Sequence, residues 1–281
     1  MKRLLGFLPA VISLAMPCAP LLAADTPAPV LWNNADRPAA PGLEHRSFQS
    51  EAMGTAVGYN VSLPRGYETG SRRYPVVYFL HGAGGDEHSD AAAFAGLVAE
   101  HVQAGKIPPA LCVFPNGGPR SGYRDNPETG ARVETMIVKE LVARVDREFR
   151  TEARREMRTV VGFSMGGAGA VRFALKYPEV FSAAGAWAGA FRFLSRPENT
   201  LPADYAVPAL AQQAGRVRLL LVVGTKDSTL ASHPPLVQNL VEAKFPFELD
   251  VLQDVEHDPG AYYVRSGDKM LRFLTATFVN R

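Results

Sequence analysis

The sequence contains little that could cross-link it or draw it to a polyanion. Its 281 residues include two cysteines, Cys18 and Cys112, and Lys and Arg together exceed Asp and Glu by only two. Cys18 lies in an N-terminal segment that we expect to be removed, which would leave Cys112 without a partner for an intrachain disulfide. Cys112 stands in an apolar run, as is typical of a small core residue in a strand. The near balance of charge gives no reason to expect nucleic-acid binding.

The chain also lacks an apolar run long enough to cross a membrane. The run at 4–16 follows two cationic residues and contains Pro9, and it is shorter than the roughly 20 residues of a membrane-spanning helix. Small residues follow it up to Ala24, so the first 24 residues predict a signal peptide. Its removal would take away two cations and no acid, bringing the formal net charge from +2 to zero. We expect an exported protein, periplasmic or secreted, with no stable membrane anchor; lipid attachment at Cys18 is disfavoured because Pro17 precedes it.

Two further regions follow this segment. Residues 25–46 are rich in Pro and Ala and predict an irregular arm, and residues 47–281 predict one catalytic domain. Within the domain, short apolar runs alternate with longer runs of helical periodicity. The predicted strands are 74–80, 110–114, 159–163, 182–187, 217–223 and 247–252. The predicted helices are 90–103, 134–149, 166–176, 235–244 and 260–278.

This alternation predicts an α/β fold with a mostly parallel central sheet and helices on both faces. Residues 48–64 alternate more loosely and suit antiparallel edge strands. In open sheets of this kind ligands bind at the carboxyl ends of the strands. Candidate functional residues are therefore sought directly after each strand.

Ser164 is the candidate nucleophile. It lies in Gly162-Phe163-Ser164-Met165-Gly166, between a predicted strand and a predicted helix. This context is the one that a nucleophile elbow requires, because the turn is tight and flanking side chains would obstruct it. The pattern predicts a serine hydroxyl presented at the edge of the sheet.

A serine hydroxyl needs a base, and the base needs an acid to fix its tautomer. His257 follows the last predicted strand, and Asp227 follows the strand before it, which is the chain order Ser, acid, His of α/β-hydrolases. The acids Asp254, Glu256 and Asp258 are too close to His257 in sequence to reach its far nitrogen. The other histidines outside that order are predicted to be surface or capping residues: His45, His88, His101 and His233.

The oxyanion that forms on nucleophilic attack needs backbone N–H donors. Met165, the residue after the serine, is expected to supply one of them. The second is expected from the loop His81-Gly82-Ala83-Gly84-Gly85, with Ala83 favoured and Gly84 as the alternative. His81 is then predicted to brace this loop and not to act as a base.

Several segments taken together resemble the esterase group of α/β-hydrolases that includes esterase D, feruloyl esterases and the mycolyltransferase antigens. The resemblance covers the chain from about residue 48 to the end. It implies carboxylic ester hydrolysis through an acyl-enzyme, with no metal and no cofactor, and it implies the same three residues reached above. The matching segments are 63–67, 74–82, 115–118, 138–141, 162–167 and 176–181.

The resemblance also bears on the substrate. It implies that Tyr123, in the segment 121–125, touches substrate, although Gly122 stands where relatives often carry Trp. Trp187 could wall the cleft together with Phe191, or it could pack in the core. The only candidate lid, 189–216, is short, which favours an open cleft for a small-molecule or polymer-linked ester.

Three readings of function remain open on sequence. A serine esterase passes the acyl group to water, and an acyltransferase of the same fold passes it to a sugar alcohol. A non-catalytic module would use the cleft to bind carbohydrate or a partner protein, and it would not need all three candidate residues. The acyl and alcohol parts of the substrate, and the oligomeric state, are not encoded in any pattern that we recognise.

Overall fold

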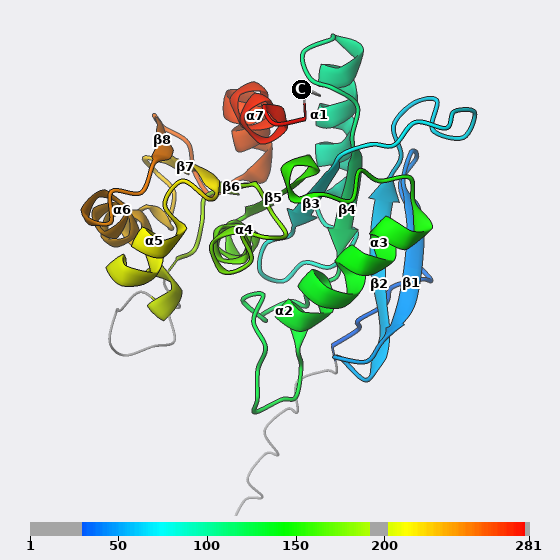
Figure 1. The fold of residues 1–281 in the computed structure, drawn as a ribbon, viewed down its shortest axis with the longest axis horizontal. Coiled ribbons are helices and arrows are strands. Elements are labelled where there is room, and N and C mark those ends of the chain that lie inside the picture. Colours follow the sequence, from blue (N-terminus) through cyan, green and yellow to red (C-terminus); the bar gives the residue numbers. More distant parts are fainter. Residues whose placement is uncertain (1–29, 192–201, 279–281) are drawn as a thin grey trace, which may run out of the picture.

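A computed structural model of the chain describes residues 30–191 and 202–278. Its centre is an eight-stranded sheet with the strand order β1-β2-β4-β3-β5-β6-β7-β8 (Figure 1). Strand β2 pairs antiparallel with both of its neighbours, β1 and β4. All other neighbouring strands pair parallel. The strands are β1 (Glu44–Ser50), β2 (Thr55–Ser62), β3 (Val76–Leu80), β4 (Leu111–Pro115), β5 (Arg158–Phe163), β6 (Ala183–Trp187), β7 (Arg218–Gly224) and β8 (Phe247–Leu252).

Helices cover both faces of this sheet, as the alternating pattern predicts. The α-helices are α1 (Ala91–Gln103), α2 (Val133–Thr135), α3 (Val142–Glu148), α4 (Met165–Lys176), α5 (Val207–Gln213), α6 (His233–Glu242) and α7 (Pro259–Thr275). The shorter helical turns are the π turn η1 (Met136–Leu141) and the 3-10 turns η2 (Arg155–Met157), η3 (Ala203–Tyr205) and η4 (Leu230–Ser232).

Two hydrophobic clusters form the core, one on each face of the sheet. Along β3, Val77 and Phe79 belong to the cluster under α1 and α7, whereas Tyr78 and Leu80 belong to the cluster under α3 to α6. This alternation is the period of two expected of a strand. Figure 1 shows α1 and α7 together on one side of the sheet and α3 and α4 on the other. The predicted fold class is confirmed.

Cys112 lies in β4 and belongs to the hydrophobic cluster under α1 and α7. It is 1% exposed and forms no disulfide. Burial raises the pKa of its thiol to about 12, because a thiolate is poorly solvated there. The prediction of a core cysteine is confirmed.

The N-terminal arm is more ordered than its composition predicts. Strand β1 begins at Glu44, inside the segment predicted to be irregular, and pairs with β2 over its whole length. The carbonyl oxygen of Trp32 also accepts a hydrogen bond of 2.7 Å from the Gly58 amide. The domain boundary predicted at residue 47 is therefore too late, because pairing with β2 supplies order that the local pattern lacks.

The segment predicted as a lid contains structure that the sequence analysis did not predict. Residues 192–201 lie outside the described residues, but η3 and α5 follow within the same segment. The predicted signal peptide also lies outside the described residues. Among the helices that the structure describes, none has the length and apolar character of a membrane span.

Candidate active site

Ser164 lies between β5 and α4 with a left-handed backbone, at φ 56° and ψ −115°. A residue other than glycine rarely adopts this conformation. It is held here by two backbone bonds, since the Ser164 amide donates to Trp187 O at 2.9 Å and Ser164 O accepts from Ala190 N at 3.0 Å. The neighbouring helix must pass close to β3, and a Cβ on Gly166 would lie 1.9 Å from Leu80 O. The strand–turn–helix predicted around Ser164 is confirmed.

The three residues predicted to act together form one hydrogen-bonded chain. His257 Nε2 lies 3.0 Å from Ser164 Oγ. On the other side of the ring, His257 Nδ1 lies 2.9 Å from both carboxylate oxygens of Asp227. Since a carboxylate can only accept, Nδ1 carries the proton and Nε2 is left free to accept one from the serine.

Asp227 is a buried carboxylate with a full set of donors. Its side chain is 0% exposed. Its Oδ1 accepts from the Thr229 amide at 2.7 Å and the Thr229 hydroxyl at 2.6 Å, and its Oδ2 accepts from Tyr262 OH at 2.7 Å. Burial alone would raise the pKa of Asp227, but the hydrogen bonds from His257, Thr229 and Tyr262 outweigh it and lower the pKa. The acid therefore stays ionised beside the imidazole.

Two backbone amides face the same space as the serine. Ala83 and Met165 both line the cavity that contains Ser164, and within the described residues neither amide donates a hydrogen bond to the protein. The Gly84 amide, by contrast, donates to Pro119 O at 2.8 Å. Of the two predicted alternatives for the second donor, Ala83 is thus the one whose N–H is available.

His81 braces the loop that carries Ala83, as predicted. It is 1% exposed, and burial lowers its pKa, so the ring is neutral. Its Nε2 accepts from the Gly117 amide at 3.0 Å, so its Nδ1 must carry the proton that is donated to Gly82 O at 2.8 Å. Both nitrogens are engaged, and neither is available as a base.

A cavity of about 590 Å³ opens in front of Ser164. Phe191 lines this cavity, which agrees with its predicted place in the wall of the cleft. Apolar groups form much of the lining, and three arginines stand among them. The lining residues include Ala83, Arg120, Gly122, Arg124, Met165, Arg172 and Phe191.

Tyr123 does not reach the cavity, and its predicted contact with substrate is wrong. Its side chain is 0% exposed, and its hydroxyl donates to His81 O at 3.0 Å. Its ring lies against Gly117 and Gly169, where a Cβ on either glycine would come within 3 Å of a ring atom. Tyr123 is thus a buried wedge between the loop after β4 and helix α4.

Trp187 is also outside the cavity, so the alternative of core packing is the correct one. Its ring is 0% exposed, and its Nε1 donates to Ser266 Oγ of α7 at 2.8 Å. The ring packs edge-on against Tyr263 and Phe94. Trp187 contributes to the elbow through its carbonyl oxygen, which accepts the hydrogen bond from the Ser164 amide.

Two of the remaining histidines, His101 and His233, are less exposed than predicted. His101 is 9% exposed and its Nδ1 lies 2.8 Å from Leu97 O, while His233 is 3% exposed and packs against the Phe191 ring. The prediction of surface or capping residues is wrong for these two, because α7 covers His101 and the loop after β6 covers His233.

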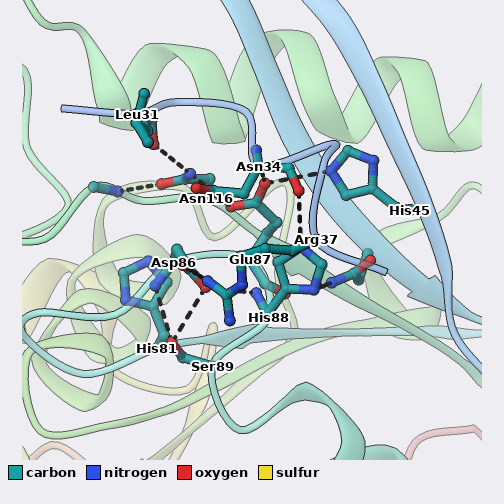
Figure 2. Close-up of polar contacts among 12 residues, drawn as sticks. Leu31, Asn34, Arg37, His45, His81, Asp86, Glu87, His88, Ser89 and Asn116 are labelled. Carbon is teal, nitrogen blue, oxygen red and sulfur yellow. Dashed lines mark hydrogen bonds and ion pairs between the residues drawn. The ribbon is translucent and has the colours of Figure 1, made fainter. Parts of the chain in front are cut away.

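His45, Glu87 and His88 are the group that the described residues offer to a metal ion, with one ligand atom from each lying within 4.8 Å of the others. The Glu87 carboxylate is already occupied by protein donors, however. It accepts from the Asn34 amide at 2.7 Å and from the side-chain amides of Asn34 at 2.9 Å and Asn116 at 2.6 Å. Figure 2 shows Glu87 at the centre of these contacts. The cluster ties the N-terminal arm to the loops after β3 and β4.

Sequence reasoning missed several residues that build the site. Tyr262 and Thr229 complete the environment of Asp227, and their only local signal is their position a few residues after His257 and Asp227. The arginines of the cavity come from separate segments, Arg120 and Arg124 from the loop after β4 and Arg172 from α4. No spacing in the sequence brings these three together.

The strand order and the serine at a strand–helix turn define this chain as an α/β-hydrolase. Residues 50–274 match the family model described as "Putative esterase". That match covers most of the chain, and the protein belongs to this family.

Curated relatives and solved structures agree with this assignment. Esterase Rv1288 of Mycobacterium tuberculosis is 39% identical over 153 residues, which are 53% of this chain and 32% of that protein. The endo-1,4-beta-xylanase/feruloyl esterase of Xylanibacter ruminicola is 32% identical over 152 residues, 50% of this chain and 20% of that protein. The chain thus spans a third or less of the length of these relatives.

Among solved structures, a ferulic acid esterase superposes with a TM-score of 0.74 at 23% identity, covering 84% of this chain and 98% of that one. An S-formylglutathione hydrolase from Agrobacterium tumefaciens superposes with a TM-score of 0.69 at 21% identity, covering 87% and 99%. At this level of identity the similarity shows the fold.

Proposed function

We propose that the protein is a serine esterase that hydrolyses carboxylic esters through an acyl-enzyme on Ser164. The observation that carries the proposal is the hydrogen-bonded chain from Ser164 Oγ through His257 to Asp227. Membership of an esterase family supports the same reaction. The esterase names of both curated relatives support it further.

In the first step His257 Nε2 takes the hydroxyl proton as Ser164 Oγ attacks the ester carbonyl. The oxyanion that forms is placed to accept from the Met165 and Ala83 amides. The bond to the alcohol oxygen then breaks, and the alcohol leaves with the proton that His257 returns. The acyl group remains on Ser164.

In the second step water replaces the alcohol. His257 takes a proton from the water, the resulting hydroxide attacks the acyl carbonyl, and the bond to Ser164 Oγ breaks. The serine recovers its proton from His257, and the acid is released. Throughout, ionised Asp227 holds the imidazole in the tautomer with Nδ1–H and stabilises its transient positive charge.

A fluorophosphonate probe tests this assignment, because it phosphonylates only a serine that a base activates. We expect the native protein to be labelled and Ser164→Ala to be unlabelled. Ser228→Ala removes another hydroxyl that lines the same cavity and should keep wild-type labelling. Equal labelling of Ser164→Ala and the native protein would rule the proposal out.

Hydrolysis of 4-nitrophenyl esters provides the second measurement. Ser164→Ala should lower kcat by about three orders of magnitude or more. Product analysis with an added sugar acceptor separates hydrolysis from acyl transfer, and we expect free acid as the main product. If the protein is labelled at Ser164 but forms only the sugar ester and no free acid, it is an acyltransferase and not an esterase.

We also propose that the protein is exported, on the basis of the charge, apolar run and small residues in its first 24 positions. Expression in a Gram-negative host, with and without these residues, tests this. Full-length protein should appear shortened outside the cytoplasm, whereas the truncated form should stay in the cytoplasm. Retention of both forms in the cytoplasm would contradict export.

A further inference from the structure

We infer that the catalytic cavity selects esters that carry an anionic group, and that Arg120 and Arg124 form the subsite that receives it. The inference rests on the proposed esterase function and names its substrate class. Three arginines, Arg120, Arg124 and Arg172, line the same cavity as Ser164 and His257. Such a concentration of positive charge attracts a counter-charge, and among the described residues no carboxylate pairs with Arg120.

Two acids, Glu134 and Asp204, form ion pairs with Arg172 and Arg124. Arg172 lies 2.6 Å from Glu134 Oε2 and 2.8 Å from Asp204 Oδ2, and its side chain is only 8% exposed. Arg124 lies 3.7 Å from the same Asp204 oxygen, so one carboxylate is shared between two guanidinium groups. Glu134 is in turn shared with Lys176. Asp204 and Glu134 are thus each shared between two cationic side chains.

The lowered pKa of Arg124 reflects both its burial and the positive charge next to it. Burial lowers the pKa of Arg124, and repulsion from Arg172 lowers it further, against the opposing effect of Asp204. An anion entering the cavity would relieve this repulsion.

Arg120 is the uncompensated member of the group. It is exposed at the rim of the cavity, and within the described residues no carboxylate forms an ion pair with it. An exposed arginine is ordinarily a solvated surface residue. The backbone beside this arginine is held by its neighbours, however.

The backbone on either side of Arg120 is hydrogen-bonded to the loop 81–85, which carries Ala83, and to the segment that contains Tyr123. Pro119 O accepts from the Gly84 amide at 2.8 Å, which places the next residue beside Ala83. Tyr123 N donates to Ser121 Oγ at 2.9 Å. The buried Tyr123 ring fixes the same segment by packing against Gly117 and Gly169. Gly122 lies between the two arginines and lines the cavity without filling it. Arg120 and Arg124 therefore lie on either side of Gly122 in the lining of the cavity that contains Ser164.

The rest of the cavity defines what the anion is attached to. Met165, Ala168, Ala190, Phe191 and Tyr205 supply an apolar wall. A ligand that fits has an apolar body and a carboxylate, sulfate or phosphate within reach of the guanidinium groups. The planar guanidinium suits all three oxyanions, because it can donate two parallel hydrogen bonds.

Matched pairs of esters that differ in one charge test the inference. The 4-nitrophenyl monoester of terephthalic acid and that of terephthalamic acid place a carboxylate or its amide on the acyl side. The butyrates of 3-hydroxybenzoate and 3-hydroxybenzamide place it on the alcohol side. The butyrates of 3-hydroxybenzenesulfonate and 3-hydroxyphenyl phosphate, each paired with the neutral butyrate of 3-hydroxybenzamide, distinguish the other two oxyanions.

In at least one pair we expect the charged ester to have a kcat/KM about tenfold or more above its neutral twin, mainly through a lower KM. Arg120→Gln should reduce this charged-to-neutral ratio about tenfold, and Arg120→Lys should restore part of it. Raising the salt concentration to about 0.5 M should also lower the ratio, because salt screens the attraction at an exposed charge. Arg147→Gln, at an exposed position on α3 away from the cavity, is the matched control and should leave the ratio unchanged.

The outcomes separate this inference from the proposed function. A wild-type protein that is labelled by the fluorophosphonate and hydrolyses neutral esters, but shows a ratio near one in every pair, overturns the anionic subsite alone. A ratio that is high but unaffected by Arg120→Gln overturns the role of Arg120. Absence of both labelling and hydrolysis overturns the esterase itself.

Discussion

Asp227 shows how the site depends on single residues. A carboxylate that is 0% exposed would be costly to ionise alone, yet donors from Thr229, Tyr262 and His257 surround it. Tyr262 OH also accepts from the Gly224 amide at 2.7 Å, which fixes the hydroxyl that faces the acid. The orientation of His257 is therefore set by Asp227 together with the donors that surround this carboxylate.

The substitution Asp227→Asn should affect both activity and stability. We expect kcat to fall by about three to four orders of magnitude, because an amide can favour the wrong tautomer of His257. The variant should also be less stable than wild type at pH 7, since the donors of Thr229 and Tyr262 are matched to a carboxylate.

This stability difference should depend on pH with a defined sign. Because the pKa of Asp227 is lowered in the folded state, its ionised form stabilises the fold fully above the unfolded pKa of about 3.9 and less as the pH falls below it. Urea unfolding at pH 7, 5 and 3 should therefore show the gap between wild type and Asp227→Asn shrinking towards pH 3. Asp254→Asn, at a side chain that is 76% exposed, is the control and should show a gap near zero throughout. A gap that widens at low pH would contradict this account.

At the scale of elements, the approach of α4 to β3 decides the geometry of the elbow. Gly162 and Gly166 are the positions that allow it, because a Cβ at either would collide with backbone atoms of the other element or of the turn. The same contact sets the distance between Ser164 and the loop after β3, which carries Ala83. The positions of Ser164, Met165 and Ala83 are thus coupled through the packing of one helix on one strand.

The substitution Gly166→Ala should break this coupling. Its Cβ would lie 1.9 Å from Leu80 O and 2.7 Å from His81 O, and backbone atoms cannot move aside without displacing the strand. We expect a loss of about 2–3 kcal/mol in the free energy of unfolding, together with a fall in kcat. Urea unfolding and ester hydrolysis measure the two effects.

Gly96→Ala is the matched control for Gly166→Ala. Gly96 lies inside α1, and nothing stands within 4 Å of its Cβ position. This change should stabilise the protein by about 0.5–1 kcal/mol, since alanine costs less conformational entropy in a helix. Equal stability of the two variants would contradict the close approach of α4 to β3 at Gly166.

At the scale of the whole molecule, Glu87 joins parts of the chain that are far apart in sequence. It lies in the loop after β3, Asn116 follows β4, and Asn34 belongs to the arm. An ion pair between Arg37 and Asp86 adds a second link beside it. The loop after β3 is therefore tied to the N-terminal arm through Glu87 and Asp86 (Figure 2).

Replacing Glu87 with Gln should loosen this junction. The new amide group would face the amide donors of Asn34 or Asn116, and at least one buried hydrogen bond would be lost, at a cost of about 2–3 kcal/mol. Hydrogen exchange should increase in the arm around Asn34 before it increases in the sheet. Glu68→Gln, at an exposed position, should change neither. Uniform exchange in both regions would show that the arm and the sheet open together.

The sequence alone determined the fold class, the elbow and the identities of Ser164, Asp227 and His257 as partners. These follow from local signals, because the apolar runs mark the strands, and parallel strands bring the residues that follow them to one edge of the sheet. The same reasoning placed Ala83 and Met165 beside the serine, since a loop after β3 and the first residue of α4 meet at that edge.

Only the tertiary structure decided which side chains reach the cavity. Tyr123 lies one residue from Arg124, yet one is a buried wedge and the other lines the site, because exposure depends on what packs against a side chain and not on its type. The meeting of Arg120 and Arg124 with Arg172 likewise depends on how a loop lies over a helix. Local patterns encode the reaction that the elbow can perform, whereas long-range packing sets the charge and shape of the space in front of it.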